Sequence, residues 1–488
     1  MGGFYGQINN MMVEIFSNHQ TLYLYHKPLP NMIKALTTLA FSIIALISCA
    51  LQPSATSGQE IVFKNVTLVP MDKERLIENQ DVLVKNGLVA AIGQSGKVKY
   101  SEQTLVVDGK GKYLMPGLAE MHAHVPPVDN LEPMKEVLLL FAANGITTIR
   151  GMLGHPLHLE LRRQLRSGEL LGPRFYTSGP SFSGNSVKTP HAAAEMVRNQ
   201  KNAGYDFLKL HPGITKENFD AITKTAHEVK IPFAGHVSYD VGVWRAIDAG
   251  YASIDHLDGF VESLVPRLDT IGEKKAGLFA MYVARYADTA GIPKLMTALR
   301  ENNIWVAPTQ ALAERWFAAD KTAEDLSQKP EMIYVDPKTL ANWTKTKKDL
   351  MSHPQYDPAD IESYIQLRRK LISECNKNGV GLLLASDAPQ VFNVPGFSTH
   401  QELQYLVDAG LTPYDALRSG TVNPARYFNL NNSGVIKQGA VSDLLLLNGN
   451  PLKDISQTQN IAGVMLGKNW LSRNELDAML KKAEKRGE

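Results

Sequence analysis

Between residues 116 and 430 the chain alternates apolar, strand-like runs with helix-like segments, and no other feature constrains the fold as strongly. Segments such as LEPMKEVLLLFAAN and KENFDAITKTAHEVK separate most of the runs. Repeated strand–helix alternation favours a parallel sheet, and eight such units fit a (β/α)8 TIM barrel. The alternative is an open doubly wound sheet, but no glycine-rich phosphate loop follows the first run. The eight runs are GLAEMHAHV, GITTIRG, RFYTSG, FLKLH, PFAGHV, SIDHL, IWVAPT and GLLLASD.

Shorter strand-like runs flank this region on both sides. Residues 61–115 and 431–475 consist of β-branched and apolar runs broken by turns, and they predict one small β-sandwich domain formed from both ends of the chain. Asn86-Gly87 and Asp108-Gly109 lie between such runs and predict hairpin turns. The segment of about residues 312–378, rich in charge and aromatic rings, predicts a helical insertion into the barrel of residues 116–430. Residues 476–488 are predicted to be a C-terminal tail.

The first 60 residues predict export. An uncharged run follows Lys34 and ends in Leu46-Ile47-Ser48-Cys49, and it is shorter than the roughly 20 residues of a membrane-spanning helix. This ending resembles the lipobox of bacterial lipoproteins, so we expect lipidation at Cys49. The expected location is then periplasm-facing or at the cell surface; a plain secretory peptide or an uncleaved anchor is the alternative. The predicted segments are an upstream extension (1–31), a signal peptide with lipobox that starts at Met32 (32–49) and a tether (50–60).

The composition favours an enzyme with a small-molecule substrate. The chain is 44% hydrophobic and 20% charged, with a net charge of +2 and no basic block. It therefore offers no electrostatic case for nucleic-acid binding, and membrane contact is expected only through the lipid anchor. Cys375 is the second of two cysteines, so no disulfide is expected if Cys49 carries lipid. The composition leaves open whether the protein is a homo-oligomer.

Potential metal ligands lie at the ends of the predicted strands. His122 and His124 are two residues apart in an extended run, which points both imidazoles to the same face. Neutral imidazoles on one face can bind one divalent cation when other ligands close the shell. In a (β/α)8 barrel the C-terminal ends of the strands share one face, so the ligand types that end the other runs predict a metal site there. These further candidates are Lys209, His236, His256 and Asp387.

The chain resembles the metal-dependent amidohydrolase superfamily, in particular the branch of imidazolonepropionases and prolidase-like Xaa-Pro dipeptidases. The resemblance spans about residues 60–470. It includes DGKGKYLMPGLAEMHAH, the strand-end ligands, and the closing segments TVNPARYFNL and GVIKQGAVSDLLLLNGNPL. Glu120 stands where an aspartate is usual, and Ser442 stands where an alanine is usual. Neither position belongs to the ligand set.

The resemblance implies two divalent metal ions. Zinc is the favoured metal, with Mn, Co or Fe as alternatives. Lys209 would bridge the ions as a carbamate formed with CO₂, because an unmodified lysine, with a reference pKa of about 10.4, is cationic and repels metal. The alternative is an ordinary salt-bridging Lys209, which would leave a mononuclear site as in imidazolonepropionase. The implied shells are His122, His124 and Asp387 for one ion, and His236 and His256 for the other.

Asp387 and Tyr239 are the catalytic candidates. A water held by two metals loses its proton far more readily than bulk water, and Asp387 can take that proton and pass it to the leaving amine. Tyr239 lies three residues after His236, where deaminases of the superfamily commonly have a glutamate, and this argues against deamination. In prolidase-like relatives a tyrosine near this position helps to polarise the scissile carbonyl. Plain packing is the alternative for Tyr239.

Arg150 and His211 are further substrate-binding candidates. Arg150 follows the apolar run GITTI and could bind a substrate carboxylate through two parallel hydrogen bonds, or it could form a structural ion pair. His211 follows Lys209 by two residues and therefore shares its face.

The sequence thus predicts a metal-dependent amidohydrolase that cleaves the C–N bond of a dipeptide, Xaa-Pro or N-acyl amino acid type of substrate. A cyclic amide hydrolase similar to imidazolonepropionase is the alternative enzyme. A non-catalytic surface binding protein built on the same scaffold is the alternative from another class.

Overall fold

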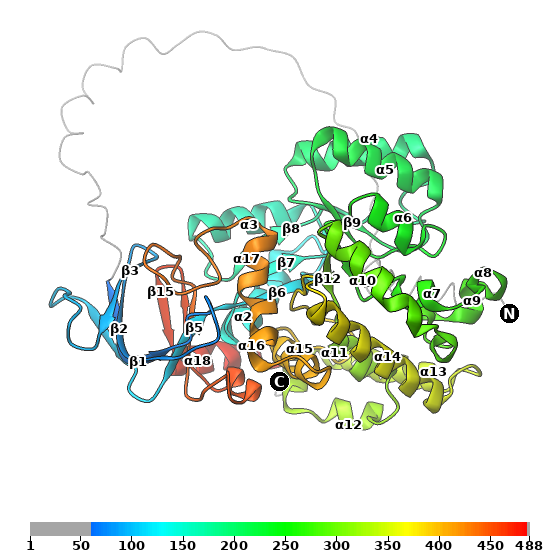
Figure 1. Ribbon diagram of the computed structural model, residues 1–488. Helices are drawn as coiled ribbons and strands as arrows, with labels where there is room; N and C mark the ends of the chain where they lie inside the picture. The colour runs from blue at the N-terminus through cyan, green and yellow to red at the C-terminus, as the bar shows by residue number, and fades with distance from the viewer. Residues whose placement is uncertain (1–59, 486–488) are drawn as a thin grey trace, which may run out of the picture. The chain divides into compact units, whose positions relative to one another are not determined.

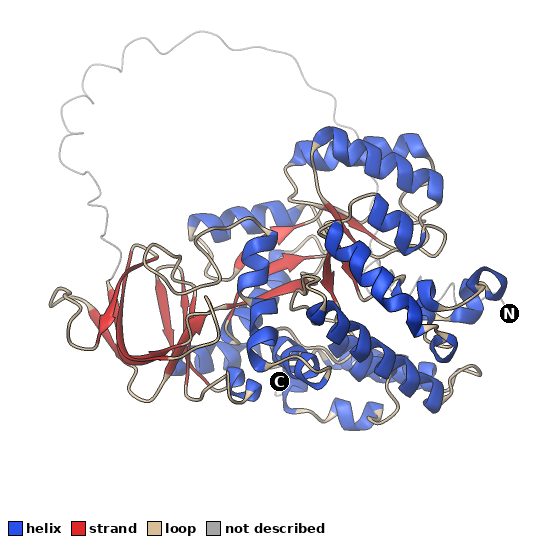
Figure 2. Cartoon of the chain, in the orientation of Figure 1, coloured by secondary structure: helices blue, strands red, loops and turns tan. Residues whose placement is uncertain are grey.

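Two parallel sheets lie at the centre of the computed structural model, which describes residues 60–485 (Figures 1 and 2). The predictions on the leader and on Cys49 lie outside these residues. One sheet has the order β6-β7-β8 and the other β12-β11-β10-β9. Strands β6, β9, β10 and β11 are buried at every position, as expected for parallel strands covered on both faces. The bounds are β6 Leu118–Ala123, β7 Ile146–Gly151, β8 Arg174–Thr177, β9 Leu208–Leu210, β10 Phe233–Gly235, β11 Ser253–Asp255 and β12 Trp305–Ala307.

Isolated parallel bridges extend the pairing beyond these sheets. Ser178, just after β8, is bridged to Phe207, just before β9. Residues 381–388, which contain the eighth predicted strand, form isolated bridges rather than a regular strand. Their backbone is nevertheless bonded on both sides, because Leu383 N donates to Val306 O of β12 and Met121 N of β6 donates to Leu384 O, both at 2.8 Å. The predicted α/β class is therefore confirmed, with seven regular parallel strands in the described residues.

Helices connect these strands, and several begin at a Thr-Pro or Asp-Pro pair. The side chain of the first residue accepts backbone N–H bonds of the first turn, and proline suits the first helical position because its missing N–H would have no partner there. The longer helices are α2 Leu131–Ala143, α3 Leu157–Ser167, α4 Pro190–Ala203, α5 Lys216–Val229, α6 Gly242–Asp248, α10 Ile292–Glu301, α13 Pro337–Met351, α14 Pro358–Lys377, α15 Phe397–Asp408, α16 Pro413–Gly420, α17 Val422–Tyr427 and α18 Arg473–Ala483. The shorter ones are α7 Phe260–Leu264, α8 Leu268–Ile271, α9 Glu273–Ala276, η1 Leu278–Ala280, η2 Ala284–Tyr286, η3 Thr289–Gly291, α11 Gln310–Leu312, η4 Ala313–Phe317, α12 Ala323–Ser327, η5 Pro330–Tyr334 and η6 Ile455–Gln459.

Both ends of the described chain join in a separate eight-stranded sheet. Its order is β15-β14-β13-β5-β1-β2-β3, with β4 also paired to β1. The two halves meet where β13 pairs antiparallel with β5, in the register Leu445 to Met115. The strands predicted as a β-sandwich from both ends therefore form one sheet. Their bounds are β1 Ile61–Leu68, β2 Ile77–Lys85, β3 Leu88–Gln94, β4 Leu105–Asp108, β5 Tyr113–Pro116, β13 Leu444–Leu447, β14 Ile461–Leu466 and β15 Asn469–Ser472.

Two local predictions at these ends have different outcomes. Asn86 and Gly87 both adopt positive φ between the antiparallel strands β2 and β3, as the predicted hairpin requires. The predicted hairpin at Asp108-Gly109 is wrong, because β4 and β5 both run parallel to β1 and follow one another along it. A side chain at Gly109 would come within 2.1 Å of Val66, so glycine is needed here for close packing rather than for a hairpin. The predicted tail is instead mostly helix α18.

The segment predicted as a helical insertion is helical in the structure and contains three buried cationic side chains, from Arg315, Lys347 and Arg368. It runs from the π-helix η4 through α12, η5 and α13 to α14. Lys347 of α13 is fully buried, and its ammonium donates to the carbonyl oxygens of Arg315 (2.9 Å), Trp316 (3.2 Å) and Ala318 (2.8 Å). Lys347 therefore ties α13 to the end of η4, close after strand β12.

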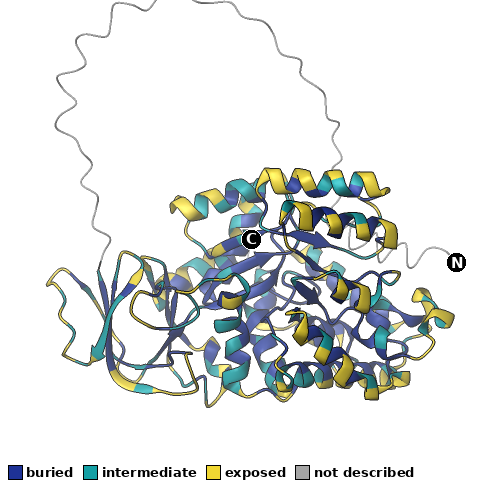
Figure 3. Cartoon of the chain, turned by 45° about the horizontal axis from the view of Figure 1, so that its top comes forward, coloured by how far each residue is buried: buried dark blue, intermediate teal, exposed yellow. Residues whose placement is uncertain are grey.

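Burial follows this layered arrangement. Figure 3 shows the central strands in the buried colour and the outer helix faces exposed. The main apolar core contains residues of the parallel strands and of the helices around them, and a second apolar cluster lies within the flanking sheet. In residues 60–485, no helix is both long enough and apolar enough to cross a bilayer.

Replacing Lys347 with methionine tests its structural role. The variant keeps the apolar stem but leaves buried carbonyl oxygens without their donor. We expect the free energy of unfolding to fall by about 3 kcal/mol. Lys345→Met on the same helix is the control, because that amine is 71% exposed and pairs with Asp349, and we expect a change within about 0.5 kcal/mol there. Denaturant unfolding measures both, and equal shifts would contradict the assigned role.

Candidate metal centre

The first two candidate ligands lie at the end of strand β6. His122 is in the strand and His124 just after it, and both side chains are buried. Glu120 fixes this strand end: its Oε1 accepts the backbone N–H groups of His122 (3.0 Å) and Ser386 (2.8 Å), and its Oε2 accepts the Ser386 hydroxyl at 2.6 Å. The carboxylate therefore joins β6 to the residue directly before Asp387.

Three residues at the strand ends adopt left-handed backbone conformations. The φ angles are 64° at His256, 50° at Thr309 and 62° at Asp387. Such a conformation costs a residue with a side chain about 1–2 kcal/mol, so surrounding contacts must hold it. Arg368 of α14 supplies such contacts, because its buried guanidinium donates to the carbonyl oxygens of His256 and Pro308, both at 2.6 Å.

Strands β9 and β10 bring Lys209 and His236 together. Gly235, directly before His236, has φ 123°, and a side chain there would come within 2.4 Å of Leu210 O and 2.8 Å of the Lys209 stem. Only glycine allows this approach of the two strands. Lys209 is consequently fully buried, with its amine 3.5 Å from His122 Nε2.

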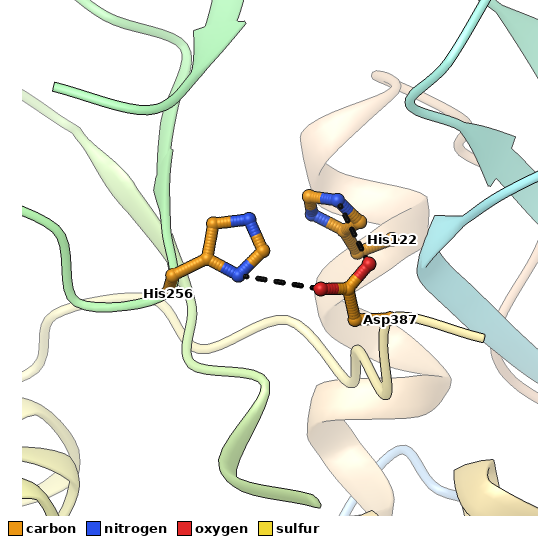
Figure 4. Close-up of side chains that lie close together, drawn as sticks. All are labelled: His122, His256 and Asp387. Carbon is orange, nitrogen blue, oxygen red and sulfur yellow. Dashed lines mark ion pairs between the residues drawn. The ribbon is translucent and has the colours of Figure 1, made fainter. Parts of the chain in front are cut away.

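The structure brings all six predicted ligands to one place. His122, His256 and Asp387 each place one ligand atom within 4.8 Å of the other two (Figure 4). His124 Nε2 lies 3.1 Å from Asp387 Oδ1. The His236 ring stacks on the His256 ring, with centroids 4.4 Å apart. Lys209 completes the group through its contact with His122.

Several polar atoms of this group lack hydrogen-bond partners although they are buried. They are Nδ1 of His122, both ring nitrogens of His124, Nε2 of His256 and Oδ1 of Asp387. A buried polar group without a partner costs about 1–3 kcal/mol, so such atoms are seldom left unpaired. Imidazole nitrogens and a carboxylate oxygen are ligands for a divalent transition metal or zinc. The unpaired atoms therefore fit the cations that the sequence predicts.

Burial also sets the protonation states that metal binding needs. It lowers the pKa of His122, His236 and His256 well below the ordinary value, and that of His124 to about 3, so the imidazoles are neutral. Neutral imidazole is the form that ligates a cation. Burial raises the pKa of Asp387 to about 7, and the nearby Lys209 opposes this rise.

A carboxylate and a hydroxyl orient two of the imidazoles. His236 Nδ1 lies 3.0 Å from Asp258 Oδ2, and His256 Nδ1 lies 2.9 Å from Thr309 Oγ1, both as hydrogen bonds. When Nδ1–H donates in this way, the lone pair of Nε2 is left for a metal. Asp255 Oδ2 lies 2.9 Å from His122 Nδ1 as a charged neighbour, without hydrogen-bond geometry. The sequence predicted a role for none of Asp255, Asp258 and Thr309. Asp255 and Asp258 flank His256 in SIDHLD, but ordinary aspartates carry no further signal of this role.

The predicted substrate-binding role of Arg150 does not agree with its place in the structure. The side chain is fully buried, and its guanidinium donates to Met121 O (2.6 Å), to Ser253 Oγ and Tyr427 OH (both 2.8 Å) and to Asp255. No N–H group of the guanidinium is therefore left to bind a substrate carboxylate. Arg150 forms the structural ion pair that was the alternative prediction from the sequence, and it holds the Asp255 carboxylate beside His122.

His211 lies against His236, whereas Tyr239 is bonded to the segment that begins near Leu268. The His211 ring is 5.1 Å from the His236 ring in a T-shaped arrangement, and burial lowers its pKa well below the usual range. The Tyr239 hydroxyl is partly buried and donates to the Leu268 carbonyl oxygen at 3.0 Å. His211 can therefore meet a ligand bound beside His236, and the Tyr239 hydroxyl is engaged by Leu268 in this structure.

Comparisons with known proteins agree with this arrangement. Ochratoxinase of Aspergillus niger is 23% identical over 420 residues, which cover 80% of this chain and 82% of that protein. The fold is similar to a solved Xaa-Pro dipeptidase with bound methionine (TM-score 0.61, 18% identity, 85% of this chain and 100% of that one). It is also similar to the bottromycin amidohydrolase (TM-score 0.65, 21% identity, 86% and 89%). The sequence model of the amidohydrolase family matches residues 113–471, which is most of the chain and includes every candidate ligand. The resemblance predicted from the sequence is confirmed, and the chain belongs to the amidohydrolase family.

Proposed function

We propose that the protein is a metal-dependent hydrolase that cleaves the amide C–N bond of a small dipeptide, Xaa-Pro or N-acyl amino acid substrate. The observation that carries the proposal is the group of unpaired, buried donor atoms from His124, His256 and Asp387. A binding protein without a metal would have no need to keep such atoms unpaired in its interior.

The substrate class is supported by the amidohydrolase relatives. The solved structures that share the fold include a Xaa-Pro dipeptidase and a prolidase complexed with N-methylphosphonate-L-proline. A cyclic amide remains the alternative substrate, because opening a ring amide requires the same attack on a carbonyl carbon. Tyr239, at the position where deaminases of the superfamily commonly carry a glutamate, argues against deamination.

We infer that residues 381–388 act as the eighth strand of a closed barrel. Their backbone bonds to β12 on one side and to β6 on the other support this. In such a barrel the C-terminal strand ends form one mouth, and the candidate ligands would all lie at it.

The ligand set can hold two divalent ions, with zinc the favoured metal. Such ions would supply the positive charge that acidifies water and polarises the substrate carbonyl. The proposed shells are His122, His124 and Asp387 for one ion and His236 and His256 for the other, with Lys209 bridging.

Asp387 is the proposed general base and acid. Its carboxylate lies among the imidazoles, 3.1 Å from His124 Nε2 and 3.7 Å from His256 Nδ1. There it can accept the proton of the attacking water and deliver it to the leaving nitrogen. Tyr239 would donate its hydroxyl to the substrate carbonyl in place of Leu268 O, and His211 would contact the substrate beside it.

Lys209 is the proposed carbamate. Burial lowers the pKa of its amine to about 8, which raises the neutral fraction near pH 7 above that of an exposed lysine. The neutral amine is the form that attacks CO₂: an N–C bond forms at Nζ, one proton is released, and the product is an anionic oxygen donor. An unmodified ammonium 3.5 Å from His122 Nε2 would instead repel a cation.

Export and lipidation at Cys49 also remain part of the proposal, together with a lipid anchor as the only membrane contact. The N-terminal mass of the mature protein tests them, and an unlipidated N-terminus other than Cys49 would exclude the anchor.

Turnover and metal content together test the function. We expect zinc-loaded protein to hydrolyse members of a panel of dipeptides, Xaa-Pro peptides and N-acyl amino acids. Asp387→Asn should lower kcat about 10³-fold without loss of fold. Asp477→Asn is the control, because that carboxylate is 63% exposed on α18. Turnover of cyclic amides alone would favour the alternative, and folded protein with neither metal nor turnover would contradict the proposal.

A carbon-13 experiment tests the carbamate. Metal-loaded protein equilibrated with ¹³C-bicarbonate should show one carbamate resonance, and Lys209→Met should remove it. Lys347 is an internal control, because burial also lowers the pKa of its amine to about 8 but no candidate ligand contacts it. A resonance that survives in Lys209→Met would show that the carbamate lies on another amine. Absence of the resonance in the wild type would show that Lys209 is unmodified, and either result would contradict the proposal.

Thr309→Val tests the orientation of His256. Valine has nearly the same shape as threonine but cannot bond His256 Nδ1, so we expect metal affinity to fall about 10-fold. Chelator competition measures this affinity. Thr346→Val is the matched control, because the Thr346 hydroxyl is buried without a hydrogen-bond partner. Equal affinities in the two variants would show that the Thr309 hydroxyl does not orient the ligand.

A further inference from the structure

Phe279 packs against the two imidazoles proposed for one metal. Its ring is nearly parallel to that of His236, at 6° with centroids 6.0 Å apart, and lies at 24° to that of His256, at 5.5 Å. The two imidazoles also stack on one another at 27°. The three rings therefore present similarly oriented flat faces beside the proposed site of hydrolysis.

The backbone is strained where it places this ring. Phe279 and Ala280 are consecutive residues with φ of 54° and 58°, in the left-handed region that residues with side chains rarely adopt. Strain of this kind persists only where surrounding structure holds it, and it concentrates at ligand-binding sites. Here the strained pair lies in a buried apolar run, Phe279 to Ala284, within a segment that otherwise carries charged residues.

The segment around Phe279 is built from short pieces rather than from a long helix. Helices α8, α9, η1 and η2 each have three or four residues. The two ends of the segment lie side by side, because Asp288 N donates to Leu264 O at 2.7 Å. Gly272 and Gly277, both with positive φ, separate its pieces. Such a segment can adjust to a ligand with few changes elsewhere.

The same segment also holds the catalytic tyrosine candidate. Leu268, at the start of α8, accepts the Tyr239 hydroxyl through its carbonyl oxygen. A ligand that moves the segment would therefore free this hydroxyl at the same time as it meets the Phe279 ring.

A second aromatic ring extends the apolar surface. Phe317, at the end of the π-helix η4, has its ring centroid 6.2 Å from that of Phe279, at 54°. Phe317 comes from the segment that follows β12, so aromatic rings reach the site from two separate elements.

We propose that Phe279 is a specificity-determining residue, forming the wall of the substrate pocket that receives a flat aromatic side chain next to the scissile amide. This inference rests on the proposed function. A flat ring bound there extends the stack of Phe279 with His236 and His256, whereas a methyl group gains little. The preferred substrates are then amides of aromatic acids or of aromatic amino acids.

Binding of hydroxamates to the zinc-loaded protein tests whether Phe279 receives an aromatic ring, and it does not require turnover. A hydroxamate group chelates a divalent metal, and phenylacetohydroxamate differs from acetohydroxamate by one aromatic ring. We expect calorimetry to give at least about 10-fold tighter binding of the aromatic compound to the wild type. Phe279→Ala should remove most of this difference and change acetohydroxamate binding less than about 3-fold. In Phe279→Leu, which keeps apolar bulk, the affinity ratio of the two hydroxamates should fall between those of the wild type and Phe279→Ala. This variant keeps the test valid if the alanine variant misfolds.

Tyr286→Ala is the matched control. Tyr286 is an aromatic residue of the same segment but is 54% exposed, so the preference for the aromatic compound should persist. An unchanged preference in Phe279→Ala, or no preference in the wild type, would overturn the inference. Failure of the protein to bind zinc would instead count against the proposed function. In active enzyme, the ratio of kcat/KM for N-acetyl-phenylalanine over N-acetyl-alanine should follow the same order among the variants.

Discussion

The interior of this protein keeps polar atoms close together without pairing them, and the rest of the structure depends on this arrangement. Oδ1 of Asp387 and ring nitrogens of His124 and His256 are buried with no hydrogen-bond partner. Each would cost stability in an ordinary core, where burial selects for paired groups. Cations at this place would turn the same atoms into ligands and make their burial favourable, because binding then contributes to the stability of the folded state.

The strand ends hold this group through a second layer of contacts. His256 and Asp387 both leave the extended conformation at positive φ, which histidine and aspartate tolerate better than most residues but still adopt uncommonly. Long-range contacts hold these conformations: Arg368 from α14 bonds the His256 carbonyl, and Glu120 of β6 bonds the residue before Asp387. The predicted helical insertion therefore contributes to the centre through Arg368, in addition to any role as a cover.

The sequence predicted the clustering of the candidate ligands better than the contacts that support them, for a physical reason. His122 and His124 follow from the period of two in a strand and from the shared edge of parallel strands, both of which are local rules. The sequence left two roles open for Arg150, substrate binding and a structural ion pair, because its acceptor Asp255 lies about a hundred residues away and only the fold brings the two together. Asp258 carries no sequence signal at all, since its role exists only through His236. The hairpin at residues 108–109 was wrong for the same kind of reason, because tertiary pairing with β1 overrides the preference of an Asp-Gly pair.

The segment between Leu264 and Asp288 links recognition to chemistry. One end of it accepts the Tyr239 hydroxyl and its middle places Phe279 against two ligand imidazoles. A substrate that is too small to displace the segment would leave Tyr239 bonded to Leu268 and so would lose the hydroxyl as well as the aromatic contact. Discrimination would then arise in kcat and not only in binding, because the side chain far from the scissile bond helps to assemble the group that acts on it. A rigid helix in this place could hold Phe279 equally well but could not release Tyr239, which gives the short helices and glycines of this segment a physical reason.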